Sequence, residues 1–300
     1  MIIKPSRLKK GDKIGIVAPA GPVKNSELQA SIKLIMEYGY QVYVSPNVYA
    51  QADYLAGDDN ARLSDFHKMF EDQEIKAVLC ARGGYGSLRL IDKISYDLVR
   101  RNPKILIGYS DITALLISIF QKTGLITFHG PLAKELAGKK KIFVDSLFRT
   151  ISTTDPITLR FAEGKSYRKG IAEGVLIGGN LTLICGLLGT PFFPPLEKVI
   201  LFIEEKGEDV YRLDRMFTQL RLSGRLRGLS AMIFGGFEDC GHKPAVEKLL
   251  MDITSDFGFP VCSKFPAGHG DENITLPIGL PALLDTGEMT LSFQQPCVKS

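Results

Sequence analysis

The sequence has few cysteines, and their spacing excludes two common uses of this residue. The 300 residues contain five cysteines, an odd number, and no CxxC pair. Structural zinc sites and disulfide frameworks both need paired, regularly spaced cysteines. Cys80 and Cys185 lie within apolar runs, where a thiol behaves as a small buried hydrophobe. We therefore expect free thiols, neither a metal nor another cofactor, and a reduced, cytoplasmic protein.

Long apolar runs and concentrated basic charge are also missing. No apolar stretch approaches the length of about 20 residues that a membrane helix needs. The N-terminal segment interrupts its apolar residues with lysine and glycine, so we expect neither a signal peptide nor an anchor. The net charge is +4, and the one dense basic run, residues 138–141, is short. Nucleic-acid binding needs a clustered basic face with a recognisable motif, so we expect no nucleic-acid partner and no membrane partner.

The first half of the chain alternates strand-like and amphipathic segments. With 45% hydrophobic residues, the chain can form one large core or two medium cores. Strands are predicted within residues 13–21, 41–48, 75–86 and 105–107, and helices within residues 25–39, 57–72 and 112–124. Such alternation predicts a parallel sheet that is covered by helices on both faces.

After about residue 140 the pattern changes, and strands outnumber helices. Strands are predicted within residues 157–161, 174–179, 198–205, 230–237 and 275–293, and helices within residues 212–224 and 245–258. This pattern predicts a second, mixed α+β domain. Residues 140–170 cluster polar residues and glycines, which favours a linker there. We place the two domains at residues 1–150 and 151–300.

Ser110 lies between a predicted buried strand and a predicted helix, in the sequence LIGYSDI. A sharp turn there would expose the hydroxyl, and the helix N-terminus would offer backbone N–H groups to a developing oxyanion. The sequence is not the G-x-S-x-G elbow, because Ile112 occupies its last position. The alternative is a helix N-cap, for which serine followed by aspartate is ordinary. These residues alone favour the cap.

A serine nucleophile needs a base, and the sequence has four histidines. His67 lies on the charged side of a predicted helix, and His242 lies in a polar loop. His129 follows a strand-like run and could be structural or line a cleft. His269 has glycines on both sides, which let the backbone bring an imidazole close to another group. A surface or turn role is nevertheless the commoner one for any single histidine.

Two adjacent glutamates, Glu204 and Glu205, end a predicted buried strand. An acid there could orient an imidazole and stabilise its charged form. Neighbouring strand residues point to opposite faces, so only one of the two can face a given cleft. Acids at strand ends are also common on surfaces, and paired carboxylates could indicate a glycosidase or a metal site. A glycosidase needs acids on both sides of one bond, which a single strand end does not supply.

A glycine-rich turn, residues 82–87, follows another predicted strand. It has neither the P-loop pattern nor the GxGxxG spacing. It could be a plain strand-to-helix turn. Alternatively, the Gly84 backbone N–H could contribute to an oxyanion hole beside Ser110, with Arg82 binding a substrate carboxylate through its guanidinium group.

Taken together and in this order, these segments resemble the LD-carboxypeptidase family. They are VAPAGPV, ARGGYGSLRLID, PKILIGYSDITALL, TFHGP, GGNLTLICGLLGTP, ILFIEE, YRLDR and GHGDENITLPIG. The resemblance covers essentially the whole chain. It implies a Rossmann-like N-terminal domain with a nucleophile elbow, a mixed α+β C-terminal domain that supplies a glutamate and a histidine, and a homodimer.

The resemblance also implies roles for individual residues. Ser110 would be the nucleophile, His269 the base and Glu204, rather than Glu205, the orienting acid. The backbone N–H groups of Gly84 and Asp111 would form the oxyanion hole. Arg82 remains a candidate for reading the substrate carboxylate.

The implied activity is that of a serine carboxypeptidase acting on a murein tetrapeptide or muropeptide. It would cut between the L-centre of a diamino acid, lysine or diaminopimelate, and terminal D-alanine. The family also contains a microcin-immunity peptidase, whose branch tends to carry extra sequence between the serine and glutamate segments and an aromatic contact. This chain is compact there and has no tryptophan, which favours the murein substrate. A catalytically inactive binding protein on the same fold is a third possibility.

Overall fold

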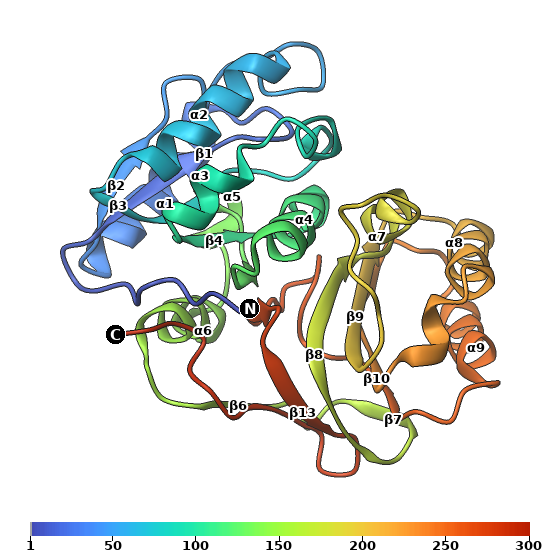
Figure 1. Cartoon of the computed structure of the whole chain (residues 1–300). Coiled ribbons are helices and arrows are strands. Elements are labelled where there is room, and N and C mark those ends of the chain that lie inside the picture. Colours follow the sequence, from blue (N-terminus) through green and yellow to red (C-terminus); the bar gives the residue numbers. More distant parts are fainter. Residues whose placement is uncertain (1) are drawn as a thin grey trace. The chain divides into compact units, whose positions relative to one another are not determined.

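The structure, a computed structural model, describes residues 2–300 and divides the chain into two compact units (Figure 1). The first unit comprises the chain up to Thr154 and residues 274–279 and 297–300, and the second comprises residues 155–273 and 280–296. The domain boundary was expected after residue 150, and the chain first passes from the first unit to the second after Thr154. Two short C-terminal segments belong to the first unit.

A six-stranded sheet forms the centre of the first unit, in the order β12-β5-β4-β3-β1-β2. Its strands are β1 (Lys13–Val17), β2 (Gln41–Val44), β3 (Ile75–Cys80), β4 (Ile105–Gly108), β5 (Thr127–His129) and β12 (Leu276–Ile278). Strands β1 to β5 are parallel, and β12 adds to the edge antiparallel, with Leu276 opposite His129.

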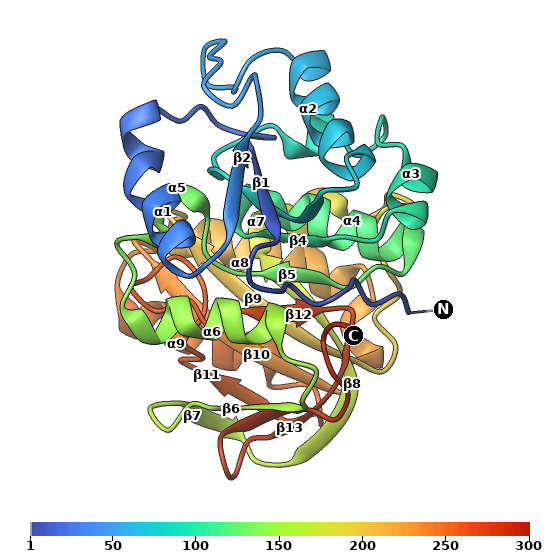
Figure 2. The same ribbon diagram turned by 90° about the vertical axis from the view of Figure 1, so that its left-hand side faces the viewer.

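Helices cover both faces of this sheet, as the alternating pattern predicts. They are α1 (Asn25–Glu37), α2 (Asp59–Glu71), α3 (Tyr96–Arg101), α4 (Thr113–Thr123), α5 (Ala133–Leu136) and α6 (Lys141–Ser152). Figure 2 shows α1 and α5 on one face and α2, α3 and α4 on the other. The predicted parallel, doubly covered sheet is therefore confirmed.

The carboxyl ends of β1 and β3 form the point at which the strand order reverses. The chain runs from β1 to β2 on one side and then crosses to β3 on the other. In open parallel sheets this is where ligands bind, outside the strand ends. Here the Gly21 N–H donates to the Gly83 carbonyl at 2.9 Å, which joins the turns that follow β1 and β3. Ser110 follows the neighbouring strand β4.

The second unit contains an eight-stranded mixed sheet, in the order β6-β14-β13-β8-β9-β10-β11-β7. Its strands are β6 (Ile157–Arg160), β7 (Lys165–Arg168), β8 (Ile171–Asn180), β9 (Val199–Lys206), β10 (Ala231–Glu238), β11 (Val261–Ser263), β13 (Pro281–Asp285) and β14 (Thr290–Phe293). Strands β8 to β11 are parallel, and the remaining pairings are antiparallel. Helices α7 (Leu181–Leu187), α8 (Val210–Leu222) and α9 (Lys243–Thr254) lie along one face of this sheet (Figure 1). The predicted mixed α+β architecture is confirmed.

The linker predicted at residues 140–170 is wrong, because this stretch is mostly regular structure. It contains α6, β6 and β7. The polar clusters lie at the ends of these elements and conceal the apolar side chains between them. In α6, Phe143, Val144, Leu147 and Phe148 recur at helical spacing and are buried.

Cys80 and Cys185 are buried, as their apolar sequence context predicts. All five cysteines are free and inaccessible to solvent. Among the helices of residues 2–300, none has both the length and the apolar character needed to cross a membrane.

Candidate active site

Ser110 lies in a strained turn at the carboxyl end of β4. Its φ angle is 63°, in the left-handed region that non-glycine residues rarely adopt. The preceding Tyr109 is extended, and the turn continues through η2 (Ser110–Ile112) into α4. Gly108 permits this bend, because a Cβ there would lie 2.7 Å from the Ile112 side chain. Backbone strain of this kind is concentrated at functional sites.

This geometry does not support the N-cap interpretation of Ser110. The N-cap positions of η2 and α4 are Tyr109 and Ile112, and neither element has a side-chain cap hydrogen bond. An N-cap residue normally has an extended backbone, whereas Ser110 is left-handed. The turn therefore resembles a nucleophile elbow, although its sequence departs from the usual pattern.

The glycine turn after β3 packs directly against this serine. A Cβ on Gly83 would lie 2.9 Å from the Ser110 Cβ and 3.0 Å from its Oγ. Only glycine lets the two backbones approach this closely. Gly84 follows with a φ of 104°, and the Asp111 nitrogen lies 3.5 Å from the same Cβ position on Gly83. Gly84 was predicted to contribute to the site, but the role of Gly83 was not.

Asp111 uses its side chain to hold this corner together. The carboxylate is buried, and its Oδ2 accepts the Ser87 N–H at 2.8 Å, while the Ser87 hydroxyl donates to the Asp111 carbonyl. Burial raises the pKa of the Asp111 carboxyl above its usual value, although the hydrogen bonds from Ser87 lower it in part. A catalytic contribution from Asp111 would therefore come from its backbone N–H.

Arg62 fixes the other end of the glycine turn. This α2 side chain is fully buried, and its Nη1 donates to the carbonyls of Gly86, at 3.0 Å, and Pro19. Its Nη2 pairs with Asp59. One guanidinium thus joins the segments that follow β1 and β3. No sequence pattern indicates this role, because Arg62 lies in a helix rich in charged residues.

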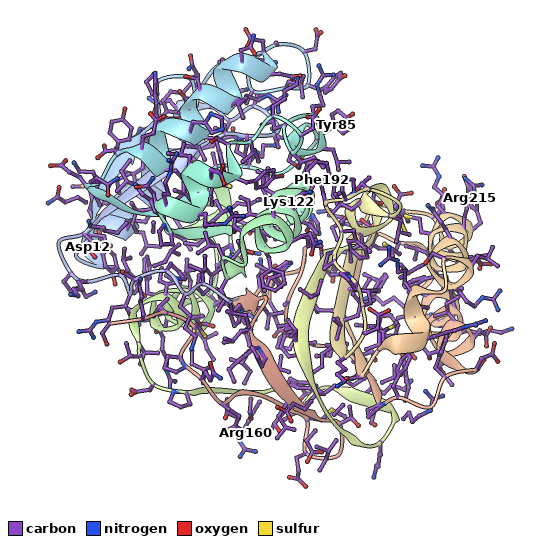
Figure 3. All side chains as sticks on the ribbon, in the orientation of Figure 1. Asp12, Tyr85, Lys122, Arg160, Phe192 and Arg215 are labelled. Atoms are coloured by element: carbon purple, nitrogen blue, oxygen red, sulfur yellow. The ribbon has the colours of Figure 1, made fainter. Side chains whose placement is uncertain are left out.

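Arg82 already has a partner within the first unit. The side chain is half-buried, and its Nη1 donates to the Pro22 carbonyl at 2.7 Å. Arg82 therefore braces the turn after β1, and its contact with a substrate carboxylate stays a prediction. Tyr85, labelled in Figure 3, is exposed beside Gly84 and makes an edge contact with the ring of Tyr54.

In the second unit, Glu204 and Glu205 have separate roles. Glu204 is completely buried near the end of β9, and its Oε2 lies 2.6 Å from Nδ1 of His269. Glu205 points to the other face, where it accepts hydrogen bonds from Asn180 Nδ2 at 2.6 Å and from the Thr182 N–H at 2.8 Å. Burial raises the pKa of the Glu205 carboxyl, although these hydrogen bonds lower it in part. The strand alternation thus gives only Glu204 access to a histidine.

The loop after β11 brings His269 against this acid. Gly268 has a φ of 123°, and a Cβ there would lie 3.0 Å from the Glu204 Cβ and from its Oε2. The Gly268 N–H donates to the buried Asn273 side chain at 3.3 Å, which fixes the loop. The flanking glycine is therefore required for the close approach. Asn273 lies in the GHGDEN segment, but its role was not predicted from the sequence.

The pair has the electrostatics of a general base. Burial lowers the pKa of His269, but the hydrogen bond and the charge of Glu204 raise it more, so that it lies above its ordinary value of 6.5. With Nδ1–H donating to the carboxylate, the neutral ring keeps a basic lone pair on Nε2. The carboxylate also stabilises the imidazolium that forms when Nε2 takes a proton.

The other three histidines have different surroundings. His129 is buried at the end of β5, with its ring 5.6 Å from that of Tyr109. His67 lies on the charged side of its helix, where exposure is expected, but it is partly buried, and its Nε2 accepts the Ser95 N–H at 3.0 Å. His242 is exposed just before α9. Within residues 2–300, no group of three or more His, Cys, Asp or Glu side chains could hold a metal ion.

Comparison with known proteins identifies the family. Residues 14–130 match the model of the LD-carboxypeptidase N-terminal domain, and residues 173–284 match that of the C-terminal domain. The chain belongs to the LD-carboxypeptidase family. It is 38% identical to the probable murein peptide carboxypeptidase of Bacillus subtilis (strain 168) over 303 residues, which cover 96% of this chain and 93% of that protein.

Solved structures of the same family have the same fold. The muramoyltetrapeptide carboxypeptidase from Oxalobacter formigenes aligns with a TM-score of 0.85 and 26% identity, over 96% of this chain and all of that one. The microcin C7 self-immunity protein MccF, in a tryptophan-to-phenylalanine variant complexed with adenosine monophosphate, aligns at 0.93 and 26% identity, over 99% and 100%. As an LD-carboxypeptidase, the chain is a serine-type carboxypeptidase.

Proposed function

We propose that this LD-carboxypeptidase removes terminal D-alanine from murein tetrapeptides, with Ser110, His269 and Glu204 as its catalytic triad. The observation that carries the proposal is the buried Glu204–His269 pair, at 2.6 Å. A buried carboxylate that orients an imidazole is the device that activates a serine hydroxyl for acyl transfer. The strained backbone at Ser110 also supports the proposal, because nucleophilic serines are found in strained strand-to-helix turns of this kind.

In the first half of the reaction, Ser110 Oγ attacks the carbonyl carbon of the diamino acid. His269 Nε2 takes the hydroxyl proton as the C–O bond forms. The imidazolium then gives that proton to the D-alanine nitrogen, and the C–N bond breaks. Free D-alanine and an ester on Ser110 result.

Water completes the reaction by the same route. It attacks the ester carbonyl while His269 takes one of its protons, and that proton returns to Ser110 Oγ as the ester bond breaks. In both halves the backbone N–H groups of Gly84 and Asp111 hold the oxyanion. Arg82 is placed in the same turn and would receive the terminal carboxylate.

The proposal includes the cellular compartment and the oligomeric state of the enzyme. Murein tetrapeptides reach the cytoplasm when cell-wall fragments are recycled, and a cytoplasmic carboxypeptidase would trim them there. The expected state is a homodimer. Sedimentation of the purified chain would test this state directly, since one species at twice the mass of 33.0 kDa is expected.

A second candidate is hydrolysis of a peptidyl-nucleotide antibiotic. The close structural match to MccF favours it. Against it, the chain lacks tryptophan altogether. The higher identity to a murein peptide carboxypeptidase also favours the murein substrate.

A substrate comparison separates the candidates. The wild-type enzyme would be incubated with a murein tetrapeptide, with the same peptide ending in L-alanine, and with an aminoacyl sulfamoyl adenosine. Release of alanine from the D-terminated peptide alone is the expected result. Cleavage of the nucleotide alone would favour the antibiotic role, and a folded protein that binds but cleaves nothing would indicate an inactive binding protein.

A further inference from the structure

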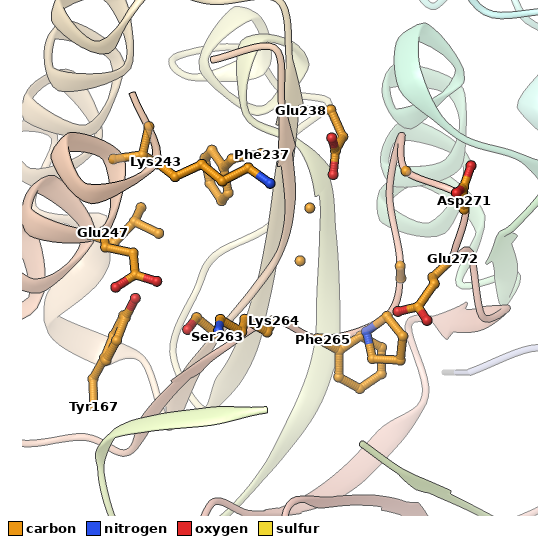
Figure 4. A pocket seen from close by; sticks show the side chains of 17 residues that line it. Tyr167, Phe237, Glu238, Lys243, Glu247, Ser263, Lys264, Phe265, Asp271 and Glu272 are labelled. Atoms are coloured by element: carbon orange, nitrogen blue, oxygen red, sulfur yellow. The ribbon is translucent and has the colours of Figure 1, made fainter. Parts of the chain in front are cut away.

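A pocket in the second unit begins at the loop that carries His269. Its volume is about 330 Å³, and it lies between α9, the end of β10 and the segment after β11 (Figure 4). Pockets that bind small ligands start at about this volume. Ala267 and Gly270, on either side of His269, both belong to its lining.

Five charged side chains line this pocket without pairing with one another. They are Lys243, Lys264, Glu238, Asp271 and Glu272. Figure 4 shows Lys243 reaching over the pocket from α9 and Glu238 facing it from the end of β10, with Asp271 and Glu272 on the far side. In residues 2–300 none of the five forms an ion pair, so both signs of charge are available to a ligand.

One further lining carboxylate is already neutralised. Glu247 pairs with Lys165 at 2.8 Å, and this pair lowers the pKa of the Glu247 carboxyl. Glu247 is therefore paired within the protein, whereas the other five charged side chains of the pocket have no ion-pair partner within residues 2–300 and can bind a ligand.

The base of the pocket is apolar, with two hydroxyl groups beside it. Val246, Leu250 and Phe265 are buried lining residues. Ser263 is only 5% exposed, and its hydroxyl interacts with that of Tyr167. Beyond this pair, neither hydroxyl has a partner among residues 2–300, and a hydroxyl can make more than one hydrogen bond, so the two can also bond to a polar ligand atom.

We infer that this pocket binds the side chain of the substrate's diamino acid, and that it selects a side chain with both an ammonium and a carboxylate group over one with an ammonium alone. Diaminopimelate is the first kind and lysine the second. The ammonium group would lie against Glu238 and Glu272, the carboxylate against Lys243 and Lys264, and the methylene groups over the apolar base. The inference rests on the proposed function, because it concerns the acyl part of that substrate, which stays beside His269 during the reaction.

Two tetrapeptides that differ only at the third residue test this selectivity. The wild type should release D-alanine from the diaminopimelate peptide with a kcat/KM about tenfold or more above that for the lysine peptide. The double variant Lys243→Met/Lys264→Met should lose about tenfold on the diaminopimelate peptide and nothing on the lysine peptide. Glu272→Gln should lower kcat/KM for both peptides, since both carry the ammonium group.

Lys248→Met is the matched control, because Lys248 is an exposed lysine of the same helix that does not line the pocket. It should behave as the wild type. An unchanged ratio of the two kcat/KM values in the double variant would overturn the inference.

Failure of the proposed function would be recognised separately. If the folded wild type releases D-alanine from neither peptide, the two peptides are titrated into it by calorimetry. Tighter binding of the diaminopimelate peptide, lost in the double lysine variant, would support the pocket assignment without the proposed reaction. Equal affinity for the two peptides would contradict it.

Discussion

Nδ1 of His269 lies 2.6 Å from Oε2 of Glu204, across 65 positions of sequence, and the carboxylate is completely buried. The pair joins the loop after β11 to strand β9 within the second unit. The burial and charge of this carboxylate determine how the imidazole can act.

Glu204→Gln should both slow the enzyme and move its pH profile. In the wild type, kcat/KM should rise with pH through a pKa above 6.5, because only the neutral imidazole can take a proton. Without the Glu204 carboxylate charge, burial, the largest of the causes, outweighs the smaller upward effect of the Glu205 charge, so the pKa should fall and the rise should move to lower pH. The plateau should fall by about 10³- to 10⁴-fold, as the ring loses its orienting acid. A variant with the wild-type midpoint would refute this role for Glu204.

Glu205→Gln should reduce stability more than activity. The Glu205 carboxylate accepts hydrogen bonds from Asn180, Thr182 and the Lys206 N–H, and the amide cannot accept all of them. The free energy of unfolding should fall by about 2–3 kcal/mol. Urea denaturation would measure this loss, and kcat should fall less than in Glu204→Gln. If Glu205→Gln were the slower enzyme, the assignment of the two acids would have to be reversed.

Gly83→Ala should inactivate the enzyme through the nucleophile. The added Cβ would lie 2.9 Å from the Ser110 Cβ, so the serine must move. A displacement of this size at the reacting group costs about 100-fold in kcat/KM. Gly138→Ala is the control, because its Cβ would come no closer than 3.4 Å to another atom. Equal activity in the two variants would show that Gly83 does not constrain the site.

Ser110→Gly should be more stable than Ser110→Ala, although both lack the hydroxyl. The φ of 63° at this position strains alanine but not glycine. We expect a difference of about 1 kcal/mol in the free energy of unfolding, after the greater flexibility of glycine in the unfolded chain is counted. Parallel urea titrations of the two variants measure it. The reverse order of stability would mean that the turn relaxes when the hydroxyl is removed.

The alternation of strands and helices predicted the sheet of the first unit because that pattern is local. β12 could not be predicted as part of it, since Leu276 pairs with His129 from far along the chain. Residues 140–170 were misassigned because polar ends conceal the apolar stripe of α6.

The candidate site was predictable in parts. Strand alternation predicts that Glu204 and Glu205 diverge, but not which one meets a histidine. Local sequence favoured a cap for Ser110, because a left-handed φ at serine leaves no trace in composition. Arg62 bonds to carbonyls 24 and 43 positions away, so its role required the folded chain. Asn273 bonds within its own loop, to Gly268, and no pattern in the sequence indicates that bond.

The most direct test of the central claim is D-alanine release from a murein tetrapeptide by the wild type and Ser110→Ala, compared side by side. Circular dichroism would establish that both are folded. We expect release by the wild type and a loss of about 10⁴-fold or more in the variant. Equal release by the two proteins would contradict the assignment of Ser110 as the nucleophile.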